Sequence, residues 1–191
     1  FHLANANFFA KMKSGAWFIN TSRGEVMETQ SLINAIESKH LAGAVIDVWE
    51  NEPKIDLKLL KLAHLATPHI AGYSADGKAN GTAISVQSIS KFFNLGMDSW
   101  KPSNIPQAPK TKLEIDFNTK SKEEIFAELS NFAYNIGFDS NKLKNSPDTF
   151  EQQRENYPIR REPENLMVIA KGTSNLTMAM IQSLGYGLHI E

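Results

Sequence analysis

The segment Ala44-Val45-Ile46-Asp47-Val48 decides the fold of the first part of the chain. Its apolar, β-branched residues are typical of a strand buried inside a sheet. The run Ala16-Trp17-Phe18-Ile19 precedes it, and this run is long enough for a buried strand but too short for a helix. His64-Leu65-Ala66 follows as a third, shorter strand candidate. We therefore expect three strands in this part of the chain.

Helical patterns separate these strands. Leu32, Ile33 and Ile36 would share one face of a helix for which Thr29 is the candidate N-cap, and a short helix is expected over 57–62. Alternating strands and helices predict an α/β fold with a parallel sheet and right-handed crossovers. In such sheets the ligand site lies beyond the carboxyl ends of the strands.

A polar motif follows each of the three expected strands. The motifs are INTSRGE at 19–25, DVWENEP at 47–53 and TPHIAGYS at 67–74. They bring one arginine, one glutamate and one histidine to the expected ligand edge of the sheet. The ordered set of motifs, more than any single one, predicts a site that binds a carboxylate and transfers a proton.

The chemistry of three side chains supports this prediction. The guanidinium of Arg23 is a planar fork of donors that fits a carboxylate. His69 can exchange protons near neutral pH, and Glu52 within hydrogen-bond reach would orient its ring. Taken alone, Arg23 would be interpreted as a surface residue beside a helix start. We interpret the other four of the five histidines as structural.

Asp47 interrupts an apolar strand, where an ionised carboxylate must be paired or exposed at the strand end. It predicts either an acceptor for a ligand amide or hydroxyl, or a cap or turn residue.

We see no histidine or carboxylate spacing typical of a metal site. The chain has no cysteine, which excludes disulfides and thiolate metal sites. A formal net charge of −1 with interspersed charges argues against nucleic-acid and membrane-surface partners.

The composition changes after the first domain. A long helix is expected over 76–93, and Pro102, Pro106 and Pro109 then predict an extended linker over 98–112. This linker would separate a first domain, residues 1–97, from a second domain, residues 113–191.

The second domain should be a small α+β domain. Alternating apolar residues over 113–117 predict a half-buried strand, and Ser121 with Glu124 forms a capping box for a helix expected to end at Gly137. Ser146-Pro147 is a further helix start. Strands over 166–170 and 186–190 should flank a helix near 176–184.

Residues 1–93 resemble the later half of the Rossmann-type nucleotide-binding domain of NAD-dependent D-2-hydroxyacid dehydrogenases. The motifs carry the resemblance, with 29 positions from Arg23 to Glu52 and 17 from Glu52 to His69. In that family the arginine binds the substrate carboxylate, the histidine is the acid/base and the glutamate orients it. The resemblance therefore implies catalytic roles for Arg23, Glu52 and His69. It also implies NAD as cofactor, contacted by Thr21, Ser22, Arg23 and Asp47.

Two details resemble one branch of this family. The motif at 67–74 implies that Gly72 contacts the cofactor and Tyr73 the substrate. The segments 150–154 and 157–162 resemble the C-terminal dimerisation domain of the same branch. This implies a cytoplasmic homodimer formed through 113–191 and a phosphorylated 2-hydroxy acid as substrate. Arg160 and Arg161 are candidate ligands of the substrate phosphate, with a solvated or salt-bridged pair as the alternative.

The chain departs from the family because it contains no G-x-G-x-x-G turn, which cradles the dinucleotide pyrophosphate. We expect a fragment that starts within a domain, binds NAD weakly and is inactive by itself. Two alternatives remain open. One is another D-2-hydroxyacid dehydrogenase, of the phosphoglycerate or hydroxypyruvate type. The other is a non-enzymatic interaction protein gated by a dinucleotide.

Overall fold

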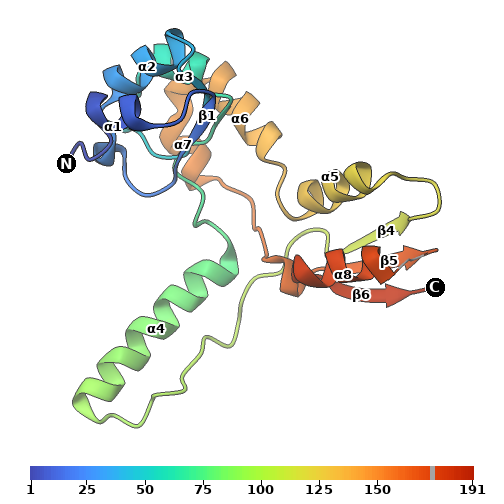
Figure 1. The fold of residues 1–191 in the computed structure, drawn as a ribbon. Helices are drawn as coiled ribbons and strands as arrows, with labels where there is room; N and C mark the ends of the chain where they lie inside the picture. Colours follow the sequence, from blue (N-terminus) through green and yellow to red (C-terminus); the bar gives the residue numbers. More distant parts are fainter. Residues whose placement is uncertain (173–174) are drawn as a thin grey trace. The chain divides into compact units, whose positions relative to one another are not determined.

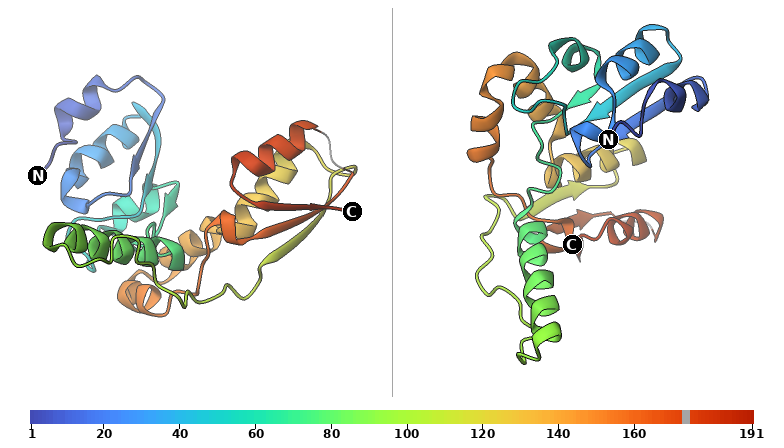
Figure 2. Two further views of the ribbon diagram at one scale, coloured as in Figure 1. Left: turned by 90° about the horizontal axis from the view of Figure 1, so that it is seen from below. Right: turned by 90° about the vertical axis from the view of Figure 1, so that its left-hand side faces the viewer.

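The computed structural model describes residues 1–172 and 175–191, which form two compact units (Figures 1 and 2). The first unit contains residues 1–71 and 136–157. The second contains residues 72–135 and 158–191. The chain therefore passes between the units three times, and the boundary between Ala71 and Gly72 falls inside the histidine motif at 67–74.

The first unit is built on a parallel sheet in the order β1-β2-β3, which confirms the expected α/β fold. The strands are β1 (Ala16–Asn20), β2 (Leu41–Ile46) and β3 (Leu65–Ala66). The helices are α1 (Ala6–Lys11), α2 (Thr29–Glu37), α3 (Leu57–Leu62), α6 (Ile136–Asn145) and α7 (Phe150–Glu155), with the 3-10 turns η1 (Gly24–Val26) and η2 (Pro147–Thr149).

Two local expectations for this unit were wrong. The strand β2 ends at Ile46, so Asp47 and Val48 lie beyond it. The backbone of Asp47 still bonds Asn20 and His69, and its carboxylate binds the loop after β3. Thr29 does not cap α2. The N-cap position is Glu28, and the backbone N–H of Thr29 is bound by the Glu50 carboxylate, a contact from a distant part of the chain.

Helices α6 and α7 pack in the first unit, which differs from the division expected at the proline-rich segment. Leu143 of α6 and Phe150 of α7 are buried in the same core as the first-unit sheet. The hydroxyl of Ser140 on α6 also accepts the backbone N–H of Ala66 in β3, at 3.0 Å. Burial of these apolar side chains is the physical reason for the association. Neither contact is encoded by nearby sequence.

The second unit contains a parallel sheet in the order β4-β5-β6. Its apolar core joins β5 to α5 and α8, which lie on the same face of the sheet (Figure 2). The elements are α4 (Ala75–Phe93), β4 (Lys112–Asp116), α5 (Lys122–Ala133), η3 (Pro163–Asn165), β5 (Met167–Lys171), α8 (Asn175–Ser183) and β6 (Gly187–Ile190).

The predicted capping box is present at the start of α5, where Ser121 and Glu124 bind each other's backbone N–H groups. The expected end of this helix at Gly137 was wrong. The helix ends at Ala133 because Tyr134 takes an extended conformation with φ −157°, and Ile136 begins α6. The long helix α4 was expected in the first domain. It belongs to the second unit, in which Asp76 at its start binds Arg161.

Tyr186 closes the core of the second unit. Its ring stacks on Phe132 with centroids 6.2 Å apart, and its buried hydroxyl donates to the carbonyl oxygen of Leu129 at 2.5 Å. Burial raises the pKa of Tyr186 to about 12. The neutral phenol is therefore favoured in the folded state.

This pKa predicts a loss of stability in alkali. Because the folded-state pKa is raised above the unfolded value of about 10, the contribution of Tyr186 is complete below pH 10 and is lost as the pH rises towards 12. We expect the difference in unfolding free energy between the unaltered protein and Tyr186→Phe to shrink by about 2 kcal/mol across this window. Urea unfolding at several pH values measures it, and a difference independent of pH would contradict the assignment.

Candidate active site

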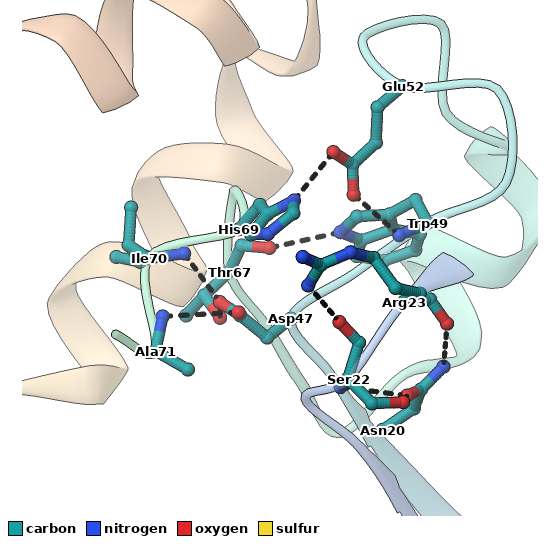
Figure 3. Close-up of polar contacts among 10 residues, drawn as sticks. All are labelled: Asn20, Ser22, Arg23, Asp47, Trp49, Glu52, Thr67, His69, Ile70 and Ala71. Atoms are coloured by element: carbon teal, nitrogen blue, oxygen red, sulfur yellow. Dashed lines mark hydrogen bonds and ion pairs between the residues drawn. The ribbon is translucent and has the colours of Figure 1, made fainter. Parts of the chain in front are cut away.

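The three polar motifs meet at one edge of the first-unit sheet. Because β1, β2 and β3 are parallel, their carboxyl ends lie at the same edge. Arg23, Glu52 and His69 follow these ends and line one pocket of about 450 Å³ (Figure 3). The structure thus brings together the three side chains to which the sequence assigned the chemistry. The pocket is also lined by Phe1, Gly24, Glu25, Trp49, Glu50 and Asn51.

His69 and Glu52 form the hydrogen-bonded pair that the motifs predicted. The ring atom Nδ1 of His69 lies 2.8 Å from Oε2 of Glu52. An ionised carboxylate only accepts hydrogen bonds, so Nδ1 is the donor and Nε2 is the nitrogen that can exchange a proton. Both side chains are partly buried, with 29% and 20% of their surfaces exposed. The pair is shielded, yet open to a ligand in the pocket.

Trp49 supports this pair, a role that the motif reading missed. Its backbone N–H donates to Oε1 of Glu52 at 2.8 Å, so both carboxylate oxygens of Glu52 are held. Its indole N–H donates to the carbonyl oxygen of Thr67 at 3.0 Å. The buried indole therefore links the loop that carries Glu52, called the glutamate loop, to the loop that carries His69, called the histidine loop. The sequence signal that could have indicated this role is a tryptophan directly before a polar turn.

Asp47 organises the backbone around His69. Its Oδ1 atom accepts the Thr67 hydroxyl at 2.6 Å and the Ile70 N–H at 2.8 Å, while Oδ2 accepts the Ala71 N–H at 3.1 Å. His69 has φ +56°, a left-handed conformation that non-glycine residues seldom adopt. Only 3% of Asp47 is exposed. Its carboxylate therefore holds a strained loop, as the turn-residue alternative predicted.

Asn20 shapes the loop at the end of β1 that carries Arg23, called the arginine loop. Its Oδ1 atom accepts both the backbone N–H and the hydroxyl of Ser22, and its Nδ2 atom donates to the carbonyl oxygen of Arg23. Thr21, Ser22 and Arg23 are exposed beyond the strand. The guanidinium of Arg23 donates to the carbonyl oxygen of Ser22 at 2.7 Å, which still leaves further N–H donors for a ligand.

Gly24 allows the arginine loop to touch the glutamate loop. A Cβ atom at this position would lie 2.0 Å from the Trp49 carbonyl oxygen and 2.6 Å from the Glu50 nitrogen. Both are backbone atoms, which cannot rotate away. The absence of a side chain at Gly24 therefore sets how closely Arg23 approaches the loop that carries Glu52.

Glu50 ties the same loop to two other segments. Its Oε1 atom lies 2.6 Å from Nε2 of His2, and its Oε2 atom accepts the Thr29 N–H at 2.8 Å. Burial raises the pKa of Glu50, but the hydrogen bonds from Thr29 and His2 outweigh burial and hold this pKa below its ordinary value. Glu50 is therefore an ionised anchor that sequence reasoning did not identify.

Gly72 and Tyr73 begin the second unit. Gly72 is exposed, and a Cβ atom there would meet nothing within 4 Å. The Nζ atom of Lys78 lies 4.0 Å from the centroid of the Tyr73 ring. Ser74 caps α4 by accepting the Gly77 N–H at 2.9 Å.

The described residues offer neither a metal site nor a membrane-spanning helix. Residues 1–172 and 175–191 contain no group of three or more His, Asp or Glu side chains that could hold a metal ion. Every helix in the same described part of the chain is too short or too polar to cross a bilayer.

The first unit matches a family of dehydrogenases. Residues 1–71 match the family model described as "D-isomer specific 2-hydroxyacid dehydrogenase, NAD binding domain". Residues 105–185 match a second model, described as a domain of unknown function, DUF3410. Residues 1–71 therefore belong to the NAD-binding domain of the D-2-hydroxyacid dehydrogenase family.

Two curated relatives are more specific, because both are named erythronate-4-phosphate dehydrogenase. The Bacteroides fragilis protein is 48% identical over 162 residues, which cover 85% of this chain and 44% of that protein. The Pseudomonas putida protein is 34% identical over 192 residues, which cover 96% of this chain and 50% of that protein. The chain spans about half the length of these relatives.

A solved structure, the apo form of Rhodotorula graminis D-mandelate dehydrogenase, is similar to part of the chain. The match covers 55% of this chain and 31% of that protein, at 30% identity and a TM-score of 0.45.

Proposed function

We propose that this chain supplies the carboxy-terminal half of an NAD-dependent erythronate-4-phosphate dehydrogenase. The whole enzyme oxidises the C2 hydroxyl of 4-phospho-D-erythronate to the 2-oxo acid, a step of pyridoxine (vitamin B6) biosynthesis. The names of the two relatives support the substrate. The observation that carries the chemistry is the 2.8 Å contact between His69 and Glu52 in the pocket that Arg23 also lines.

The proposed roles of His69, Glu52 and Arg23 follow from their place in the lining of the pocket, and that of Tyr73 follows from the family resemblance. Nε2 of His69 accepts the proton of the C2 hydroxyl, while Glu52 holds Nδ1 and stabilises the imidazolium that results. The guanidinium of Arg23 binds the substrate carboxylate and stabilises negative charge on the oxygen at C2. Tyr73 contacts the substrate.

The residues fit the nicotinamide end of NAD. Hydroxyls at Thr21 and Ser22 are exposed at the ligand edge, together with the Arg23 guanidinium, and Oδ2 of Asp47 can accept a second hydrogen bond, such as one from a carboxamide. Gly72 is exposed and leaves space for close approach. When bound, NAD supplies the hydride acceptor. The pyrophosphate needs a glycine-rich turn that this sequence does not contain, so we propose that the 191 residues bind NAD weakly and are inactive alone.

A comparison of substrates tests the proposed function. The full-length protein that contains this chain should reduce NAD with 4-phospho-D-erythronate at a kcat/KM at least a hundredfold above that with 3-phosphoglycerate or glycerate. This preference is expected because 3-phosphoglycerate is one carbon shorter, which changes the position of its phosphate, and glycerate has no phosphate. Absorbance at 340 nm follows the reaction, with the 191-residue chain assayed in parallel.

The outcomes separate the alternatives. Preference for 3-phosphoglycerate would assign a phosphoglycerate-type dehydrogenase, and preference for glycerate would assign a hydroxypyruvate-type enzyme. NAD binding without turnover of any acid would favour a dinucleotide-gated interaction protein. Turnover by the 191 residues alone would contradict the proposal that they are inactive without the remainder.

We also propose a cytoplasmic homodimer formed through residues 113–191. Apolar side chains exposed on this part of the second unit support an interface, among them Phe126 at 50% and Ile190 at 51% exposed. Light scattering of the full-length protein measures the mass, and a monomer at micromolar concentration would exclude the dimer.

A further inference from the structure

A buried ion pair joins the start of α4 to the segment before β5. Arg161 donates from Nε to Oδ2 of Asp76 at 2.9 Å and from Nη2 to Oδ1 at 2.9 Å, which is a bidentate arrangement. Only 4% of Asp76 and 5% of Arg161 are exposed. The Asp76 carboxylate also accepts the Glu162 N–H at 2.7 Å and Nδ2 of Asn165 at 3.1 Å. We call these four residues the Asp76 cluster.

This geometry removes Arg161 from the candidate ligands of the substrate phosphate. Arg161 was a candidate ligand of the substrate phosphate, but its Nε and Nη2 atoms are committed to Asp76 and its side chain is buried. Its third nitrogen, Nη1, lies 3.4 Å from the Pro106 carbonyl oxygen. The guanidinium of Arg160 lies 4.3 Å from the centroid of the Tyr134 ring. Arg161 therefore acts within the protein.

The Asp76 cluster holds both segments by which the chain enters the second unit near Gly72 and Pro158. Asp76 lies three positions after Tyr73, and Arg161 lies three positions after Pro158. A backbone bond from the Ala75 N–H to the Arg160 carbonyl oxygen, 2.8 Å, runs beside the ion pair. The first residues of α4, two and three positions after Tyr73, are thus fixed by side chains and backbone of the segment 160–165.

The two sides of the histidine motif are therefore held differently. Asp47 fixes the backbone at Ile70 and Ala71 within the first unit. The Asp76 cluster fixes the residues just after Tyr73 within the second unit. Removal of one partner of a buried ion pair is strongly destabilising, so loss of Arg161 should loosen the start of α4, which follows Tyr73 closely in the chain.

We propose that Arg161 is a positioning residue for substrate binding: through Asp76 it fixes the loop that presents Tyr73. This inference rests on the proposed function, in which Tyr73 contacts the substrate. It gives residues 105–185, which match the domain of unknown function, a part in substrate binding beyond dimerisation.

A double-mutant cycle in the full-length protein tests the proposal. Arg161→Met should raise the KM for 4-phospho-D-erythronate about tenfold and leave the KM for NAD within twofold, because misplacement of one contact group weakens binding at that group. Tyr73→Ala should raise the same KM. The double variant should match Tyr73→Ala within twofold, because Arg161 has no further effect once Tyr73 is absent. The proposal would be overturned if the KM increases of the two single variants multiplied in the double variant, or if Arg161→Met had an unchanged KM.

Milder variants and a control keep the test independent of folding. Arg161→Lys keeps the charge but not the bidentate bonds, and Asn165→Ala removes one bond to Asp76, so both should raise the KM by smaller factors. Lys120→Met breaks the surface ion pair with Glu128 in the same unit and should leave the KM unchanged. An equal rise in Lys120→Met would indicate general loosening of the unit and overturn the proposal.

Hydrogen exchange gives a readout that does not need turnover. Arg161→Lys should increase amide exchange over residues 72–78 at least tenfold, with exchange over 65–70 unchanged. If the unaltered protein oxidises no acid, the proposed function fails. The positioning role of Arg161 is overturned separately if the amides over 72–78 remain protected in Arg161→Lys.

Discussion

We expect His69→Asn to lower the kcat of the full-length protein by about a thousandfold. The variant removes Nε2, the atom placed to accept the substrate proton, while asparagine tolerates the left-handed backbone at φ +56°. Substrate KM should change less than threefold, because Arg23 still binds the carboxylate. Steady-state kinetics with 4-phospho-D-erythronate measures both constants.

Glu52→Gln should have a smaller effect than His69→Asn. The amide keeps a hydrogen bond to Nδ1 but loses the negative charge that stabilises the imidazolium formed in the reaction, so kcat should fall about tenfold. His189→Asn, the same substitution at an exposed histidine of β6, is the matched control. Equal activity of the His69, Glu52 and His189 variants would favour the interaction protein over the enzyme.

Gly24→Ala should damage both folding and turnover. The new methyl group would lie 2.0 Å from the Trp49 carbonyl oxygen and 2.1 Å from its carbonyl carbon. Relief of this clash requires the arginine loop and the glutamate loop to separate. We expect a loss of about 3 kcal/mol in the free energy of unfolding. We also expect kcat/KM to fall about a hundredfold, because displacements near 1 Å between catalytic groups have effects of that size.

Gly81→Ala is the matched control for this prediction. Gly81 lies exposed in α4, and a Cβ atom there would meet nothing within 4 Å. Alanine should therefore stabilise the helix by about 0.5–1 kcal/mol. Urea unfolding compares the two variants on one scale. A Gly24→Ala protein as stable and active as the unaltered one would show that contact between the loops is not required.

The pairing of His69 with Glu52 was predictable because short motifs at parallel strand ends converge by the geometry of the sheet. The same argument places Arg23 at the pocket. It does not reveal what supports these side chains. Trp49 and Glu50 lie in the same motif, yet their partners Thr67, His2 and Thr29 come from other segments.

The sequence also left the role of Asp47 open between a ligand acceptor and a turn residue. The structure shows its carboxylate bound to the Thr67 hydroxyl and to two backbone N–H groups of the histidine loop. The roles of ligand acceptor and turn residue are compatible, because one carboxylate can hold a loop and accept a further hydrogen bond. A single aspartate in an apolar run cannot indicate which backbone groups it will meet.

The sequence by itself determined the local elements and the chemistry. The apolar runs define the parallel strands, Ser121 and Glu124 start α5, and the motifs carry Arg23, Glu52 and His69. These features depend on residues that are close in the chain or on the fixed direction of parallel strands.

Only the tertiary structure decided which elements share a core and which charges pair. Leu143 and Phe150 joined the first core although they follow the expected domain boundary. Arg161 paired with Asp76, 85 positions away, instead of remaining available for a phosphate. Apolar burial is non-directional and a buried ion pair needs only a geometric match, so the sequence does not indicate which distant partner such a residue will meet.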